Sequence, residues 1–128
     1  MIGGLADTSV FIAFESGRAV DIGALPELLR VSVITIGELR QGVLSAKEAD
    51  VRAARLDTLT RALSLEPVPV MESVAESWAL LRVQLRSRGR SMPINNSWIA
   101  ATAMALRIPV VTQDSDYDGV PGLDVIRV

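Results

Sequence analysis

The chain has 128 residues, of which 49% are hydrophobic and 22% are charged, and its formal net charge is −2. This length and composition indicate one globular domain, and they exclude a disordered, collagen-like or coiled-coil chain. The absence of cysteine and histidine excludes disulfide scaffolds, thiol nucleophiles, His-containing triads and zinc sites with Cys or His ligands. Any catalysis must therefore depend on carboxylates, hydroxyls, arginine or a bound metal ion.

Short β-like runs alternate with helical patterns along the chain, which predicts an α/β domain with a mainly parallel sheet over residues 1–128. Strands are expected at 1–6, 31–35, 108–112 and 123–128, the last at a sheet edge. Helices are expected at 10–14, 26–30, 36–44, 46–63, 71–87 and 97–106, the last capped by Asn95 and Asn96, and a short extended piece at 67–69.

The apolar residues of these helices predict their packing. An amphipathic stripe of Ala49, Leu56, Leu59 and Leu63 is expected in the core, with an edge that could receive a partner helix. Trp98 is expected to pack its helix onto the sheet rather than to contact a nucleic acid.

Neither end shows a targeting segment, and the apolar runs are shorter than the roughly 18 residues that a membrane helix needs. We therefore expect a cytoplasmic protein without membrane contacts.

Charge is distributed unevenly along the chain. Residues 77–113 contain no Asp or Glu but five arginines (Arg82, Arg86, Arg88, Arg90 and Arg107), so this segment carries +5 and the remainder −7. The asymmetry predicts an anionic partner for one face, and a solvated helix end explains it equally well.

Acidic residues recur just after the predicted strands. Asp7 follows the first strand, Glu38 lies in the first turn after the second, and Asp114 and Asp116 follow the third. Taken singly, each is explained by a helix cap or a turn. Since groups beyond the carboxyl ends of parallel strands line one crevice, we expect the acids to converge. Converging carboxylates repel unless a cation compensates, and oxygen ligands favour Mg²⁺ or Mn²⁺.

The ordered motifs resemble those of PIN-domain ribonucleases of the VapC toxin type, and the resemblance covers nearly the whole chain. The strings that carry it are LADTSVFIA, VSVITIGELRQGVL, INNSWIAATAMALRIPVVTQDSDYD and VPGLDVIRV. The resemblance implies a PIN-like sandwich and a metal-dependent endoribonuclease, the toxin of a toxin–antitoxin pair. Its implied partners are an RNA substrate and a VapB-type antitoxin, and we also expect a homodimer.

Carried over by position, the resemblance assigns metal binding to Asp7, Glu38 and Asp114, with Asp116 nearby. Asn96 stands where the family has a third acid, and either natural divergence or a deliberate Asp→Asn change accounts for it. Because an amide adds no negative charge, we expect weaker metal binding and reduced or absent cleavage. In an active relative, the metal would activate water for in-line attack, which leaves 5′-phosphate ends.

Arg82, Arg86, Arg88 and Arg90 are the candidate contacts to the RNA backbone, with structural ion pairs as the alternative.

Three other functions compete with the nuclease as interpretations of the sequence. A receiver-type phosphoacceptor needs a lysine near a late strand, but the only lysine is Lys47, and an aspartate-nucleophile phosphatase needs an acid where Ser9 stands. The serious alternative is a non-catalytic PIN-like module that binds RNA or a protein, for which Asn96 is the main support.

Overall fold

A four-stranded parallel sheet lies at the centre of the protein, in the order β2-β1-β3-β4. The computed structural model describes residues 3–128. The strands are β1 (Gly3–Ala6), β2 (Leu28–Arg30), β3 (Val110–Thr112) and β4 (Val125–Arg127). All three strand pairs are parallel, with Leu5 opposite Val110 and Val111 opposite Ile126. The predicted α/β class and the parallel sheet are confirmed, with β4 at an edge as expected.

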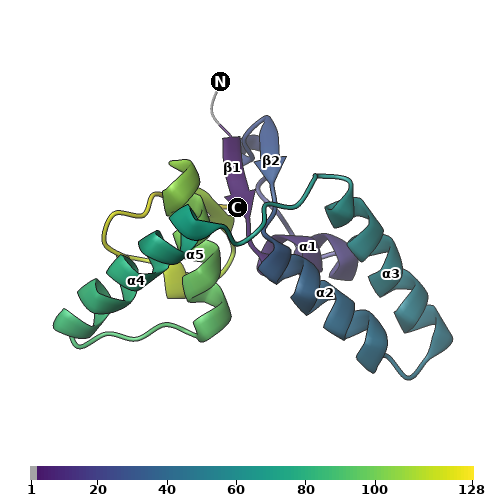
Figure 1. Cartoon of the computed structure of the whole chain (residues 1–128). Helices are drawn as coiled ribbons and strands as arrows, with labels where there is room; N and C mark the ends of the chain where they lie inside the picture. Colours follow the sequence, from purple (N-terminus) through teal and green to yellow (C-terminus); the bar gives the residue numbers. More distant parts are fainter. Residues whose placement is uncertain (1–2) are drawn as a thin grey trace.

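Five α-helices and two short 3₁₀ helices flank the sheet. They are α1 (Thr8–Ser16), η1 (Ile22–Ala24), α2 (Val33–Ser45), α3 (Ala49–Leu63), α4 (Glu72–Ser87), α5 (Ile94–Leu106) and η2 (Ser115–Tyr117). Figure 1 shows α1, α2 and α3 on one side of the strands and α4 and α5 on the other. Within the described residues, no helix is long and apolar enough to cross a membrane.

Successive side chains of the two central strands, β1 and β3, point alternately into two hydrophobic cores. Leu5 and Val110 point into a core shared with α4 and α5, which includes Leu81 and Ile99. The next residues along each strand, Ala6 and Val111, belong to a separate cluster with Val10 of α1. Because successive side chains of a strand point to opposite faces, the two central strands are buried at every position, and only Thr112 at the end of β3 has a polar side chain.

The second predicted strand is shifted, and the helix predicted at 26–30 is wrong. Residues 28–30 form β2, paired with β1, and the chain reaches α2 by Val33. The Oγ of Ser32 accepts a hydrogen bond from the Ile34 backbone N–H at 3.0 Å and caps α2. This capping overrides the strand preference of the β-branched residues at 31–35. The first predicted strand is found at Gly3–Ala6, and its residues 1–2 lie outside the described part.

Two packing predictions are also wrong. Leu59 is buried, but Leu56 and Leu63 are 50% and 41% exposed and Ala49 is exposed too, so the α3 stripe is not a core stripe. Trp98 packs on α4 rather than on the sheet: its ring stacks on Trp78 with centroids 4.3 Å apart.

Pro93, not an asparagine, occupies the N-cap of α5. The helix therefore starts at Ile94, and Asn95 and Asn96 lie inside its first turn without capping it. Their side chains are consequently free to contact other elements, which matters for the site described below.

We expect Gly4→Ala to destabilise the fold, because a Cβ at Gly4 would lie 2.6 Å from Val111 Cγ2 and 2.9 Å from Pro26 Cγ. Overpacking of this kind costs about 1–3 kcal/mol. Gly37→Ala in α2 is the control, since a Cβ there meets nothing within 4 Å and should stabilise the helix by roughly 0.5–1 kcal/mol. Urea unfolding measures both, and equal effects would contradict the packing described here.

Candidate active site

The carboxyl ends of β1 and β3 place two acidic segments side by side. Asp7 directly follows β1, and its backbone N–H donates to the Val111 carbonyl at 3.0 Å. Asp114 lies two residues beyond β3 and begins η2. The adjacency of these strands in the sheet, rather than in the sequence, brings the acids together.

Asp7 is a buried carboxylate, with 2% of its surface exposed. Ser9 Oγ donates to Asp7 Oδ1 at 2.6 Å, and the same Oγ accepts from the Gln113 backbone N–H at 2.9 Å. Burial raises the pKa of Asp7 to about 6, and the Asp114 charge adds to the rise, while the hydroxyls of Ser9 and Thr112 oppose it. Burial of Asp7 therefore disfavours its charged form relative to its neutral form.

Glu38 reaches the same region from the second turn of α2 rather than the first. Thr8 Oγ1 donates to Glu38 Oε1 at 2.6 Å and lies 3.1 Å from Thr35 Oγ1. Asn95 Nδ2 is 3.5 Å from Glu38 Oε2. Thr8 and Ser9 are neighbours in the sequence, so one turn of α1 orients both Glu38 and Asp7.

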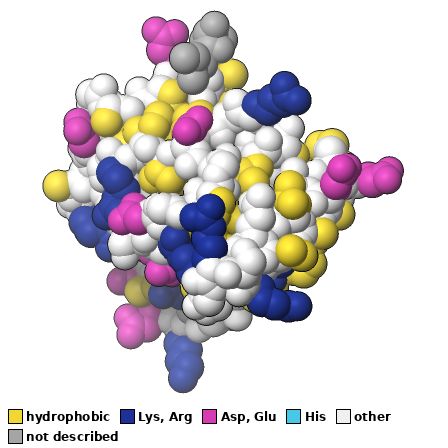
Figure 2. Space-filling view, turned by 90° about the vertical axis from the view of Figure 1, so that its left-hand side faces the viewer, with side chains coloured by type: hydrophobic (Ala, Val, Ile, Leu, Met, Phe, Trp, Pro, Cys, Tyr) yellow, Lys and Arg dark blue, Asp and Glu magenta, His cyan; other side chains and the backbone are white. Residues whose placement is uncertain are grey.

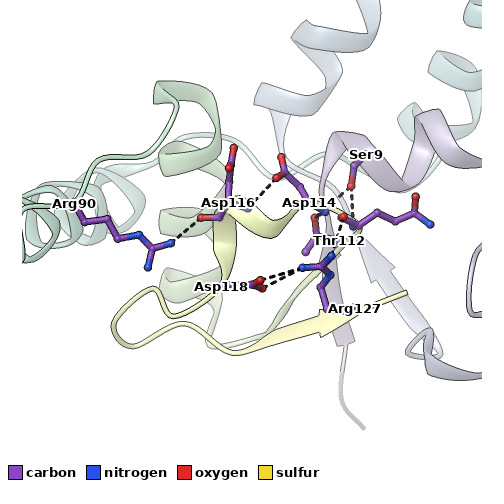
Figure 3. Close-up of polar contacts among 8 residues, drawn as sticks. Ser9, Arg90, Thr112, Asp114, Asp116, Asp118 and Arg127 are labelled. Atoms are coloured by element: carbon purple, nitrogen blue, oxygen red, sulfur yellow. Dashed lines mark hydrogen bonds and ion pairs between the residues drawn. The ribbon is translucent and has the colours of Figure 1, made fainter.

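Asn96 contacts the two remaining acids, Asp114 and Asp116. Its amide Nδ2 lies 3.3 Å from Asp114 Oδ2 and 3.3 Å from Asp116 Oδ2. Since ionised carboxylates only accept hydrogen bonds, the amide is the donor to both. Asp114 Oδ1 also accepts from the Asp116 backbone N–H at 2.9 Å. This bond fixes residues 114–116, which we call the acidic loop and which Figure 3 shows.

The structure therefore links the predicted site residues through pairwise contacts: Asn96 contacts Asp114 and Asp116, and Asn95 and Thr8 contact Glu38. We call Asp7, Glu38, Asp114 and Asp116 the acidic cluster. In residues 3–128, no set of three acidic side chains lies close enough to hold a metal ion by itself. The position that faces both Asp114 and Asp116 is Asn96, where a third carboxylate would make such a set.

A hard cation suits the chemistry of this donor set. The side-chain donors around the acidic cluster are hydroxyls and amides, and neither of the ion pairs found within 3–128 involves a member of the cluster. The carboxylate oxygens of the acidic cluster are ligands of the kind that Mg²⁺ prefers. The metal itself stays a prediction.

Tyr117 lies beneath the acidic cluster. Its side chain is fully buried, and its hydroxyl is the one buried side-chain polar atom in the described region without a hydrogen-bond partner. Burial raises the pKa of this phenol, and the four carboxylates of the cluster raise it further, Asp7 most of all. A neutral hydroxyl is thus buried close to the negative charges.

The four candidate RNA-binding arginines occupy different environments. Arg82 and Arg90 are half-buried, whereas Arg86 and Arg88 are exposed. Arg82 lies over the Trp78 ring, 5.4 Å from its centroid. Arg90 donates to the backbone carbonyl of Asp116 at 3.1 Å, so it contacts the acidic loop directly, as Figure 3 shows.

Sequence reasoning missed the orienting roles of Thr8, Ser9 and Asn95. The helix predicted at 10–14 begins at Thr8, with Asp7 at its N-cap and no side-chain capping bond, and the hydroxyls of Thr8 and Ser9 contact Glu38 and Asp7 instead. The adjacency of the hydroxyls to Asp7 was the available signal. Asn95 carried no such signal, because Glu38 is 57 residues away in the sequence.

The sequence pattern of the PIN domain matches residues 5–123. This match includes β2, β3, all five α-helices and every member of the acidic cluster, and it ends just before β4. The chain belongs to the PIN-domain family.

Individual relatives narrow the assignment. The chain is 46% identical over 128 residues to Ribonuclease VapC5 of Mycobacterium tuberculosis, covering 98% of this chain and 95% of the relative. It is 47% identical over 124 residues to Ribonuclease VapC4 of the same organism, covering 97% and 95%. The crystal structure of VapBC-5 from M. tuberculosis superposes with a TM-score of 0.91 at 42% identity, covering 100% of both chains. Within the family, the chain groups with the VapC ribonucleases.

Asp7→Asn should stabilise the metal-free protein near neutral pH. The folded-state pKa of about 6 lies above the ordinary 3.8, so the contribution of Asp7 to stability is complete below pH 4 and is lost as the pH rises through 6. Two pKa units correspond to roughly 3 kcal/mol. Urea unfolding in EDTA should show a flatter pH dependence for the variant between about pH 4 and 7, and an unchanged slope would contradict the buried-charge interpretation.

Tyr117→Phe should also stabilise the metal-free protein. Removing a buried hydroxyl without a partner relieves a desolvation cost of about 1 kcal/mol or more, and the ring keeps its packing with Leu5 and Ile99. Thermal unfolding measures the change. A lower melting temperature would mean that the hydroxyl makes a hydrogen bond in solution, for instance to an ordered water.

Proposed function

We propose that this chain is the toxin of a type II toxin–antitoxin pair and a Mg²⁺-dependent endoribonuclease whose cleavage Asn96 weakens. Its relatives are named ribonucleases, and the matching crystal structure is described as a member of the VapBC family of toxin–antitoxin systems. The partner we propose is a VapB-type antitoxin. An RNA substrate places its action in the cytoplasm, and a homodimer stays a prediction.

The observation that carries this proposal is the acidic cluster at the carboxyl edge of the sheet. Hydroxyls of α1 orient Asp7 and Glu38, and the first turn of α5 faces Asp114 and Asp116. A site of converging carboxylates without a cationic side chain suits a divalent ion and a phosphodiester.

Asp7, Glu38, Asp114 and Asp116 would hold Mg²⁺ directly or through water, because no three acids within residues 3–128 lie close enough to bind one ion by themselves; Mn²⁺ is the alternative ion. A bound divalent ion stabilises negative charge on a phosphate and makes water a better nucleophile near neutral pH. The chain's own part is positional: Ser9 fixes the Asp7 carboxylate, and Thr8 fixes that of Glu38. Attack by water rather than by a ribose hydroxyl would leave 5′-phosphate and 3′-hydroxyl ends.

Asn96 gives specific support to a second candidate, a non-catalytic module that binds RNA or protein. Its amide N–H groups face Asp114 and Asp116, so they occupy the acceptor sites that a cation would use. To offer its oxygen instead, the amide would have to turn over and lose both hydrogen bonds. This contact is the physical reason for the weakened activity we propose.

Asn96→Asp tests the choice between the two. A carboxylate at position 96, beside those of Asp114 and Asp116, should lower the stability of the metal-free protein through repulsion. It should also make the stability respond to Mg²⁺, because a ligand that binds only the folded state stabilises it, by about 2.7 kcal/mol at 100 times Kd. Thermal unfolding with and without millimolar MgCl₂ measures this. The same variant should cleave RNA faster than the unaltered chain and leave 5′-phosphate ends.

The control is the double variant Asn96→Asp with Asp114→Asn, which returns the cluster to its original number of carboxylates. It should lose the Mg²⁺ response. If Asn96→Asp neither responds to Mg²⁺ and Mn²⁺ nor cleaves RNA, the binding module is the better description. Cyclic-phosphate ends on cleaved RNA would refute attack by water.

A further inference from the structure

A pocket of about 320 Å³ at the end of α4 gathers three of the arginines. Its walls are Arg82, Leu85, Arg86, Gly89, Arg90 and Ser91. No acidic side chain lines it, and neither ion pair found in residues 3–128 involves these arginines. Arg88 does not line the pocket, so the structure separates it from the other three.

Three arginines that line one pocket without a carboxylate among them repel one another, and an anion is the ligand that offsets this repulsion. The favourable end of a helix dipole accounts for one cation at the last turn of α4. It does not account for the arrival of Arg90 from the following loop. The chemistry of the pocket is therefore that of an anion site.

Two of the three arginines are held in place before any ligand arrives. Arg82 lies over Trp78, whose ring stacks on Trp98 and whose Nε1 donates to Ser97 Oγ at 3.0 Å. Arg90 is anchored to the Asp116 carbonyl at 3.1 Å. Positioning of this kind lowers the entropic cost of binding. Arg86 is exposed and has no side-chain hydrogen bond among those found, so it is free to close on a ligand.

Arg90 also connects the pocket to the acidic loop. It lines the pocket and contacts the residue that Asn96 holds beside Asp114. On the face shown in Figure 2, dark blue basic side chains lie close to magenta acidic ones. A strand with one phosphodiester at the acidic cluster would have another within reach of the arginines.

We propose that this pocket is a subsite for a backbone phosphate of the RNA, next to the scissile one, formed by Arg82, Arg86 and Arg90. The inference rests on the proposed function, since it assumes an RNA strand at the acidic cluster. It goes further in assigning a single phosphate to a defined pocket and in excluding Arg88 from it.

The test compares Arg86→Gln with Arg107→Gln. Both variants remove one positive charge, but Arg107 caps the far end of α5, outside the pocket. Fluorescence anisotropy with a labelled single-stranded RNA of about 12 nucleotides, in EDTA to prevent cleavage, gives Kd over a series of KCl concentrations. Circular dichroism checks that both variants are folded.

We expect Arg86→Gln to weaken RNA binding about fivefold at low salt and to flatten the slope of log Kd against log salt by about 0.7, the value for one phosphate contact to a single strand. Arg107→Gln should change neither by a comparable amount. Inorganic phosphate should compete with the RNA less effectively in Arg86→Gln than in the unaltered chain.

Equal changes in Kd and in the salt slope for the two variants would overturn the subsite, because the loss of any one positive charge would then have the same effect on RNA binding. An effect of Arg86→Gln on Kd without a change in the salt slope would overturn it as well, since a phosphate contact must release counterions. If the unaltered chain binds no RNA at any salt concentration, neither in EDTA nor with MgCl₂, the RNA-directed function itself fails. The two failures are therefore distinguishable.

Discussion

Repulsion among carboxylates that a parallel sheet brings to one edge is the constraint on which the site depends. Here neutral donors, not cationic side chains, keep the acidic cluster together: Ser9 and Thr8 on one side, and Asn95 and Asn96 on the other. Such donors satisfy lone pairs but do not cancel charge. Burial, and to a smaller extent the Asp114 charge, raises the pKa of Asp7 in spite of the hydroxyls of Ser9 and Thr112.

This arrangement makes the first turn of α5 decisive for function. A side chain at position 96 faces Asp114 and Asp116 whatever its chemistry, because Pro93 is the N-cap of α5 and the helix begins at Ile94. An amide there completes a hydrogen-bonded, metal-independent cluster, whereas an acid would add a third negative charge. The replacement of one carboxylate oxygen of an aspartate by the amide nitrogen of Asn96 thus separates an arrangement that is stable without a cation from one that needs a cation.

The arginine pocket at the end of α4 and the acidic cluster have opposite charges and are connected by one hydrogen bond, from Arg90 to Asp116. Arg90 binds the backbone carbonyl of Asp116 and not its carboxylate, so the carboxylate stays available to other ligands and the guanidinium keeps its charge. Because the contact is to the main chain, it positions the two charged regions without neutralising either. A polyanion that approaches this face meets attraction beside the very carboxylates that would otherwise repel it.

The sequence alone predicted the α/β class and the position of Asp7, Glu38 and Asp114 after strands, and the resemblance to PIN-domain ribonucleases marked the departure at Asn96. Strand periodicity and the position of acids after strands carry this information locally. Tertiary structure decided what local patterns cannot: that residues 28–30 pair with β1 rather than form a helix, that Leu56 faces solvent, and that Asn96 donates to two acids 18 and 20 residues away. Capping, strand pairing and side-chain contacts over such separations depend on the assembled fold, because their energies arise only when distant segments meet.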